Sequence, residues 1–144
     1  MKKTLITSLL IAITFSCSND DNGNSNCNFL LNVGVATSLN LNLPQYSQLQ
    51  FVSNAVYVPN QGNRGLIVIN TGTGFMAWDA ADPNRMLSSN CSILEIDGVE
   101  AVNTCDEDNR YSLFTGQPLN NPDLRCALRN YPTQLNGSEL FIGN

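Results

Sequence analysis

The sequence predicts an all-β domain, a small sandwich or barrel. Roughly ten short segments rich in apolar residues are separated by turns containing Gly, Pro, Asn and Asp, which is typical of such folds. After the N-terminal leader, no segment keeps apolar residues at helical spacing for three turns. With 144 residues, 42% apolar and only 13% charged, the chain is long enough for one domain with a buried core.

The N-terminus has the layout of the export signal of a bacterial lipoprotein. Lys2 and Lys3 precede an apolar run, residues 5–15, that is too short to span a bilayer. The run meets Cys17 and a polar segment, as in a signal whose lipid is attached to the cysteine after cleavage. An ordinary secretory signal cut elsewhere and a buried helix are the alternatives. We expect a signal peptide at residues 1–16, lipidation of Cys17 and attachment to the outer membrane of the cell envelope.

Residues 17–26 are expected to form a flexible tether, because they are polar and rich in Asn, Ser and Gly after Cys17. Asp20 and Asp21 resemble the surface-export signal of lipoproteins in the Bacteroidetes-type envelope, which predicts exposure on the cell surface; a solvated linker is the alternative. Removal of the signal leaves five arginines and no lysine against 12 acidic residues. Such an acidic surface repels nucleic acid and anionic lipids. We therefore expect no nucleic acid partner, and we expect attachment to the membrane through acyl chains.

The folded domain is expected at residues 27–144, and its first half contains four short apolar segments. Strands are predicted at residues 39–43, 55–58, 66–69 and 75–78. In the first of them leucine alternates with asparagine before Pro44, as in a half-buried strand. The third is a nearly continuous apolar run, which is typical of a central strand. The glycines between the third and fourth favour a tight hairpin rather than a phosphate loop, since no lysine or helix follows them.

The second half continues the same pattern and contains two strong hairpin signals. Asp97-Gly98 and Asn136-Gly137 are preferred two-residue turns between strands. Further strands are predicted at residues 92–96, 100–102, 111–114, 127–133 and 139–142. The chain shows no internal repeat and no second domain.

Cysteine and histidine usage limits the chemistry. The chain has no histidine, which excludes Ser-His-Asp and Cys-His catalysis and histidine-based metal sites. If Cys17 carries lipid, four cysteines remain, and an even number in an exported chain predicts two disulfides with three possible pairings. A metal site is the competing interpretation, but no Cys-x-x-Cys pair is present.

Five short motifs follow one another along the second half of the chain. They are GFMAWD at 74–79, YSLFTG at 111–116, a proline loop at 118–122, LRNY at 128–131 and GSELFI at 137–142. In this order and spacing the chain resembles the Rieske-type [2Fe–2S] domain family, and in particular small flavobacterial surface lipoproteins that carry this domain in degenerate form. The resemblance implies a Rieske-like β domain in which two loops at the tip hold the cluster through two cysteines and two histidines.

All four ligand positions implied by the resemblance are changed. In the first loop Asp82 and Asn84, on either side of Pro83, replace the cysteine and the histidine of the family's Cys-Pro-His motif. In the second loop Asn103 stands at the place of the cysteine and Asp106 at the place of the histidine. We therefore expect no cofactor, although a [2Fe–2S] cluster is what the family would lead one to expect.

The resemblance also implies the disulfide pairing. One branch of the family has an additional cysteine in each loop, and Cys91 and Cys105 occupy those two positions, so this disulfide ties the two tip loops together. Cys27 and Cys126 then remain as the second pair, which fastens the start of the domain to a late strand. An all-thiolate cluster would need all four cysteines to converge, and thiols in an oxidising compartment pair first.

These features favour a non-catalytic binding or structural module at the cell envelope, with an unknown protein or glycan partner. The alternative is an electron-transfer protein with a [2Fe–2S] cluster. A hydrolase using Asp82 and Asp106, and calcium binding by Asp82 with residues 106–109, are weaker hypotheses, because neither a pocket motif nor a calcium-loop pattern accompanies them. Phe75 and Trp78 are expected in the core rather than on a sugar-stacking platform.

Overall fold

A computed structural model describes residues 27–143, and all structural statements refer to that part of the chain. The expected signal peptide at residues 1–16, the lipidation site Cys17 and the tether at 17–26 lie outside the described residues. Within the described part, eleven strands and a single 3-10 helix, η1 (Ser47–Gln50), are present. No helix found there is long and apolar enough to cross a bilayer.

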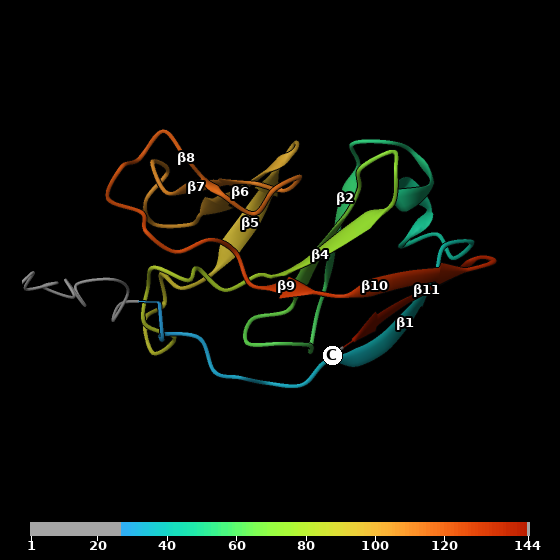
Figure 1. Ribbon diagram of the computed structural model, residues 1–144, viewed down its shortest axis with the longest axis horizontal. Helices are drawn as coiled ribbons and strands as arrows, with labels where there is room; N and C mark the ends of the chain where they lie inside the picture. Colours follow the sequence, from blue (N-terminus) through green and yellow to red (C-terminus); the bar gives the residue numbers. More distant parts are fainter. Residues whose placement is uncertain (1–26, 144) are drawn as a thin grey trace, which may run out of the picture.

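The strands form three antiparallel sheets (Figure 1). The first has the order β1-β11-β10, the second β2-β3-β4-β9 and the third β5-β6-β7-β8. The strands are β1 (Ala36–Asn40), β2 (Ala55–Val58), β3 (Leu66–Asn70), β4 (Phe75–Asp79), β5 (Leu94–Asp97), β6 (Glu100–Asn103), β7 (Arg110–Ser112), β8 (Pro118–Leu119), β9 (Asn130–Tyr131), β10 (Thr133–Asn136) and β11 (Glu139–Gly143). The predicted all-β fold class is confirmed.

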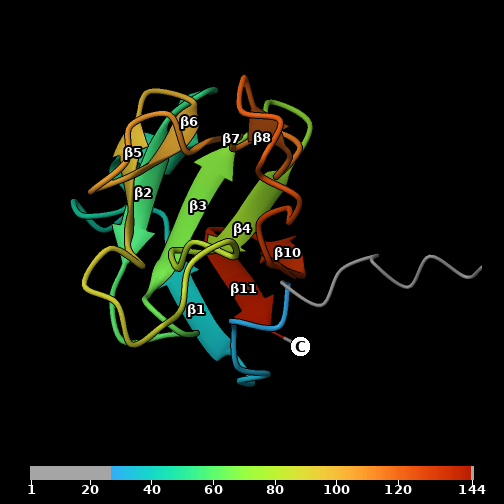
Figure 2. The ribbon, with the colours of Figure 1, turned by 90° about the vertical axis from the view of Figure 1, so that its left-hand side faces the viewer.

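The sheet around β3 is the central layer of the domain. Figure 2 shows β3 and β4 between β5 to β8 above and β1 and β11 below. Four successive residues of β3 are fully buried: Leu66 and Val68 pack into one hydrophobic cluster, and Ile67 and Ile69 pack into the other. The apolar run therefore became a strand buried on both faces, as predicted. Trp78 also belongs to the core, and its indole N–H donates to the Leu113 carbonyl at 2.7 Å.

The two predicted hairpins are present, but each turn lies one residue later than predicted. Asp97 pairs with Glu100, and Asn136 pairs with Glu139, so Gly98 and Gly137 take the first central position of their turns. Both glycines have φ of 61°. Glycine adopts this backbone conformation without a steric penalty, which explains why glycine and not the preceding polar residue enters the turn.

Other strand boundaries differ from the prediction for identifiable reasons. β1 ends at Asn40 because the chain turns there, with the Leu43 N–H donating to the Asn40 carbonyl at 3.0 Å. The strand predicted at 127–133 is wrong in its extent: β9 pairs with β4, and β10 pairs with β11. Pro132, which has no N–H to donate, separates these two strands. The short strand β8 begins with a proline and was not predicted.

Candidate functional site

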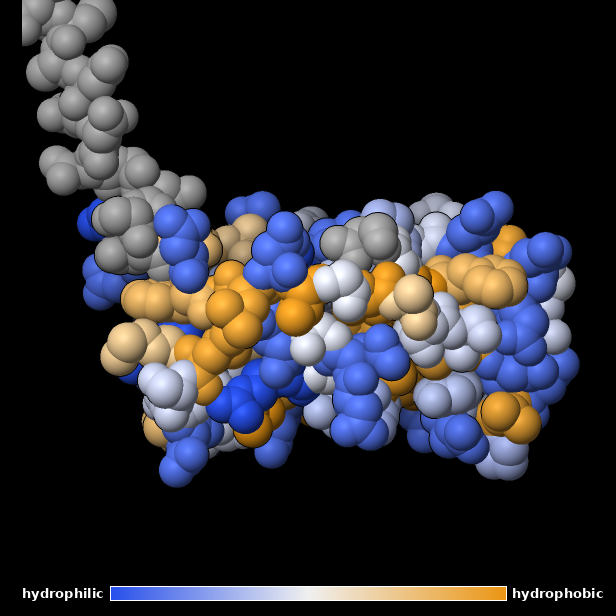
Figure 3. Space-filling view, turned by 90° about the horizontal axis from the view of Figure 1, so that it is seen from below, coloured by the Kyte–Doolittle hydropathy of each residue, from blue (hydrophilic) through white to orange (hydrophobic). Residues whose placement is uncertain are grey.

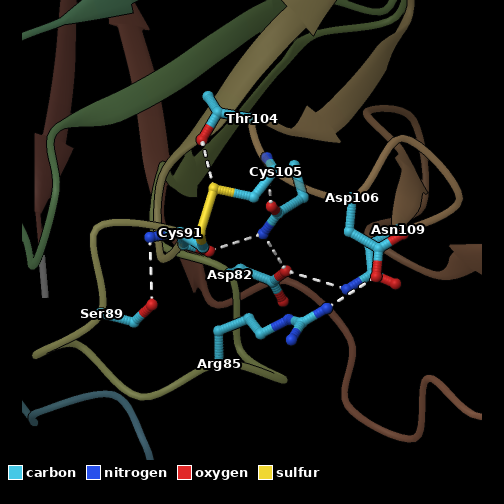
Figure 4. The surroundings of a disulfide bond; sticks show 9 residues. Asp82, Arg85, Ser89, Cys91, Thr104, Cys105, Asp106 and Asn109 are labelled. Carbon is cyan, nitrogen blue, oxygen red and sulfur yellow. Dashed lines mark hydrogen bonds and ion pairs between the residues drawn. A yellow bond between two sulfur atoms is a disulfide. The ribbon is translucent and has the colours of Figure 1, made fainter.

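The candidate site is the loop end of the domain, formed by the loop between β4 and β5 and the loop between β6 and β7 (Figure 4). Cys91 in the first loop and Cys105 in the second form a disulfide, with their Cα atoms 5.3 Å apart. Cys27 and Cys126 form another, with a Cα–Cα distance of 5.5 Å. Both predicted pairings are confirmed. The second one fastens the beginning of the described chain to the same end of the molecule.

Asp82 is the centre of the loop end. It is fully buried, and its carboxylate accepts four hydrogen bonds. Oδ1 accepts from the Tyr111 hydroxyl at 2.6 Å and from the Asn84 backbone N–H at 2.9 Å. Oδ2 accepts from the Asn103 amide at 2.6 Å and from the Asn109 amide at 3.4 Å. Four donors around one carboxylate offset the cost of burying its charge.

Asn84 extends this network to the segment that carries Cys126. Its amide nitrogen donates to the Tyr111 hydroxyl at 2.8 Å and to the Cys126 carbonyl at 2.9 Å. Its Oδ1 accepts from the backbone N–H groups of Arg125, at 3.2 Å, and Cys126, at 3.1 Å. Asn84 therefore uses both sides of its amide to hold the Cys126 segment against the first loop.

Asn103 and Asp106 behave differently. The Asn103 amide donates to Asp82 and, at 2.8 Å, to the Cys91 carbonyl, which connects the two loops beside the disulfide. Asp106 instead forms an ion pair with Arg85 at 2.6 Å, in which both side chains are about two-fifths exposed. Three of the four positions assigned to degenerate ligands thus meet in one network around the buried Asp82. Figure 4 shows the fourth, Asp106, beside Arg85 at the rim of this network.

Burial determines the protonation of the tyrosine in this network. The pKa of Tyr111 is raised well above its ordinary value of 10.0, first because the phenol is buried and second because the Asp82 carboxylate lies beside it. The neutral hydroxyl is therefore maintained as a donor to Asp82 throughout the physiological range. Tyr111 was predicted only as a strand residue, and its pairing with a buried aspartate could not be read from its position.

The residues of the loop end do not fit a Rieske cluster. Such a cluster requires two thiolates and two imidazoles, but the chain has no histidine and the four described cysteines are paired with one another. Residues 27–143 contain no group of three or more His, Cys, Asp or Glu side chains placed to hold a metal ion. The oxygens of Asp82 are occupied by protein donors, as are both sides of the Asn84 amide.

The acidic cluster expected around Asp82 is not formed. Asp82 is surrounded by amides and a phenol, whereas Asp106 contacts Arg85 at the surface. The calcium and hydrolase hypotheses both needed these two carboxylates to act together, and the buried Asp82 is not available to a substrate. The separation arises because Asn103 and Asn109, rather than the acidic residues between them, turn inward.

A second buried carboxylate was missed by the sequence interpretation. Asp79, the last residue of β4, is fully buried and accepts from the Tyr131 hydroxyl at 2.8 Å. It also accepts from the backbone and side-chain nitrogens of Asn63, both at 2.8 Å, and from the Ala81 N–H at 3.0 Å. Asp79 therefore fixes the turn before β3 against the start of the first loop. Burial, followed by the hydrogen bond to Asp79, raises the pKa of Tyr131.

Two clefts at the loop end are both lined by Arg125. The smaller, about 280 Å³, is lined by Arg125, Arg129, Leu30 and Pro83 together with the Cys27–Cys126 disulfide. The larger, about 590 Å³, has Arg85, Asp106, Asp123 and Phe29 among its lining residues. Neither arginine of the smaller cleft was singled out from the sequence.

Comparison with models of protein families gives no match, and comparison with curated proteins gives no match either.

Proposed function

We propose that this chain is a lipid-anchored module of the cell envelope whose Rieske-like tip has lost its iron ligands and serves as a non-catalytic binding or structural component. The observation that carries the proposal is the Asp82 network. Where the resemblance implies cluster ligands, Asp82, Asn84 and Asn103 bind one another and their neighbours through hydrogen bonds. A network of this kind stabilises two loops in a fixed shape, which is what a binding surface requires.

The place where the described chain begins supports a loop end that lies close to the membrane in this proposal. The described chain begins at Cys27, which is bonded to Cys126 next to the Asp82 network. A lipid on Cys17 would be connected to this point by the tether at residues 17–26, which can span at most about 35 Å. The loop end, with its clefts, would then face the membrane or the material directly above it.

Metal content tests the first half of this proposal. The chain is purified under argon, and its iron, acid-labile sulfide and visible spectrum are measured. We expect neither stoichiometric iron nor a Rieske-type resonance after reduction, and titration should find no free thiol among the four domain cysteines. Stoichiometric iron with matching sulfide would restore the electron-transfer alternative.

Fractionation tests the second half. We expect the chain to enter the outer membrane fraction and to incorporate labelled palmitate, because acyl chains are the expected source of its membrane affinity. A Cys17→Ala variant should lose the label and the membrane association, and a Cys27→Ala/Cys126→Ala variant serves as the cysteine control that keeps both. Membrane association without acylation at Cys17 would contradict the anchor.

A further inference from the structure

The arginines of the domain are unevenly paired. Arg110 forms ion pairs with Asp97 and Glu100, and Arg85 forms one with Asp106. Within residues 27–143, the other three arginines contact no carboxylate side chain at ion-pair distance, and all three belong to the loop end: Arg64, Arg125 and Arg129. In so acidic a chain, unpaired arginines gathered at one end indicate a site for an external anion.

Arg125 and Arg129 both line the smaller cleft. No acidic residue lines this cleft, and its remaining wall is apolar, formed by residues such as Leu30 and Pro83. Guanidinium groups beside apolar walls attract a carboxylate or phosphate more strongly than they do on an open surface, because less water screens the charge. Arg125 is exposed, and its side chain makes no hydrogen bond or ion pair to another described residue, so its donors are not used within the described part of the chain.

Contacts with neutral groups hold the Arg129 guanidinium in place. Its guanidinium donates to the Leu31 carbonyl at 2.9 Å and to the Asn32 side chain, and it lies over the Tyr131 ring at 5.6 Å from the centroid. These contacts use only neutral acceptors, so the positive charge is not neutralised by them. A side chain that is already ordered loses little entropy when a ligand binds.

The segment at the start of the described chain forms part of the wall of both clefts. Figure 1 shows the segment before β1 running from the loop end along the lower edge of the molecule. Figure 3, from below, shows apolar residues along this face, with strongly hydrophilic residues beside them near the loop end. Leu30 lines the smaller cleft and Phe29 the larger one, so the same segment bounds both.

The larger cleft, which Arg125 also lines, contains an acidic and an aromatic side chain. Asp123 contributes a carboxylate that has no cationic partner among the described residues, and Phe29 contributes a half-buried ring. The amides of Asn84 and Asn121 also line this cleft, but they are engaged in internal hydrogen bonds and give it a fixed shape. Free acceptors, free donors and an aromatic ring suit a ligand with several hydroxyl groups.

We propose that the two clefts around Arg125 form one binding site for an acidic saccharide. The sugar carboxylate binds Arg125 and Arg129 in the smaller cleft, and the neighbouring hydroxylated ring lies in the larger cleft against Phe29 and Asp123. This inference rests on the proposed function as a binding module and specifies its ligand class. A neutral saccharide lacks the group that the arginine-lined cleft selects.

Calorimetric titration of the full chain, as purified from its host, with trigalacturonic acid is the direct test. We expect saturable binding that weakens as salt is added, because ion pairs at a partly open cleft are screened. The fully methyl-esterified trimer is the matched control, since it keeps every ring hydroxyl and loses the charges. No binding of the acid at about 5 mM, which corresponds to an affinity too weak to be specific, or equal binding of the ester would overturn the inference.

Variants locate the site. Arg125→Gln should weaken binding at least about tenfold, and Arg125→Lys should weaken it less, because the point charge remains while bidentate geometry is lost. The Arg125 side chain has no described partner, so neither change should alter the unfolding curve. Arg110→Gln removes the same charge from a residue that lines neither cleft, and we expect less than a twofold effect. Unchanged affinity of Arg125→Gln would place the ligand elsewhere and refute the site.

A second experiment distinguishes a membrane glycolipid from a free saccharide as the source of the acidic sugar. The chain is reconstituted in phosphatidylcholine vesicles with and without a glucuronic acid glycolipid, and the trimer titration is repeated. Weaker apparent binding in the glycolipid vesicles assigns a membrane glycolipid, and unchanged binding assigns a free saccharide. Both results presuppose binding in the first experiment. Absence of trimer binding would overturn this inference alone, because the proposed function is tested by iron content and acylation.

Discussion

Buried carboxylates organise the loop end at the scale of single residues. Asp79 and Asp82 lie three positions apart, both completely inaccessible, and each binds one tyrosine hydroxyl together with amide groups. A buried carboxylate without partners would be strongly destabilising, so each aspartate requires its donors in place. The two carboxylates therefore hold the surrounding turns in place through these hydrogen bonds.

Substitution of Asp82 should be costly, whereas the same substitution at Asp106 should not. Asp82→Asn turns an acceptor of four hydrogen bonds into a group with its own donors, which face the amides of Asn103 and Asn109. We expect a loss of about 3 kcal/mol in the free energy of unfolding, measured with urea. Asp106→Asn, at an exposed ion pair, should cost about 0–1 kcal/mol. Equal effects would mean that the network is not what orders the loops.

The tyrosine partners predict how stability depends on pH. Tyr111 and Tyr131 have pKa values raised above 10.0 in the folded state by burial and by their aspartates. The folded state then binds more protons than the unfolded state above pH 10, so their contribution is complete below that pH and is lost as pH rises beyond it. Each tyrosine should lower stability by at most about 1.4 kcal/mol per pH unit in this window.

Urea unfolding at successive pH values between neutrality and strongly alkaline conditions measures this slope. Tyr111→Phe should start from a lower stability, because Asp82 loses a donor, and should show a shallower alkaline slope than the unchanged chain. Tyr57, a half-exposed tyrosine whose hydroxyl donates to a backbone carbonyl, provides the control as Tyr57→Phe. An alkaline slope that does not change in Tyr111→Phe would contradict the assignment.

The residues of the loop end were predictable by position but not by role. The resemblance indicated Asp82, Asn84 and Asn103, and these three residues are joined by hydrogen bonds in the structure. Their hydrogen-bond partners could not be predicted, because an aspartate in a loop is expected to be exposed unless Tyr111 and Asn109 are known to face it. The sequence pattern carries no information on which of two neighbouring polar residues turns inward.

At the scale of elements, the two disulfides should contribute unequally. Cys91–Cys105 closes a sequence separation of 14 residues, and Cys27–Cys126 closes one of 99. On the chain-entropy estimate the first is worth about 3 kcal/mol and the second about 4.7 kcal/mol. Double Cys→Ala variants measured by urea unfolding should show this order. A larger loss from the Cys91–Cys105 variant would indicate that ordering of the folded loops, rather than unfolded-chain entropy, dominates.

The strands were predictable wherever packing and local pattern agree. β2, β3 and β4 were located to within a residue because their apolar runs are bounded by Pro, Gly and Asn. β8 and β9 are only two residues long. β8 begins with a proline and pairs with the neighbouring β7, so propensity does not indicate it. β9 lies inside the longer strand predicted at 127–133, and it pairs with β4, which is distant in sequence. The extent of β9 depends on its pairing with β4, a tertiary contact that a local pattern does not contain.

At the scale of the whole molecule, the central strands β3 and β4 connect two hydrophobic clusters. The first cluster includes residues of β1, η1 and β11, and the second includes residues of β5, β6 and β7, so the two have no outer element in common. Both use β3 and β4, whose side chains point alternately into one and the other. Disruption of either cluster therefore removes the packing on one face of β3.

Unfolding should be a single cooperative transition for this reason. Val68→Ala and Ile67→Ala change adjacent residues of β3 that face opposite clusters, and each should cost roughly 2–4 kcal/mol. The single tryptophan, Trp78, belongs to the second cluster only and reports on it by fluorescence, while far-UV circular dichroism reports on all three sheets. In both variants we expect the two signals to shift together to a lower urea midpoint. If Val68→Ala lowered the dichroism midpoint and left the Trp78 midpoint unchanged, the clusters would be independent folding units, and β3 would not couple them.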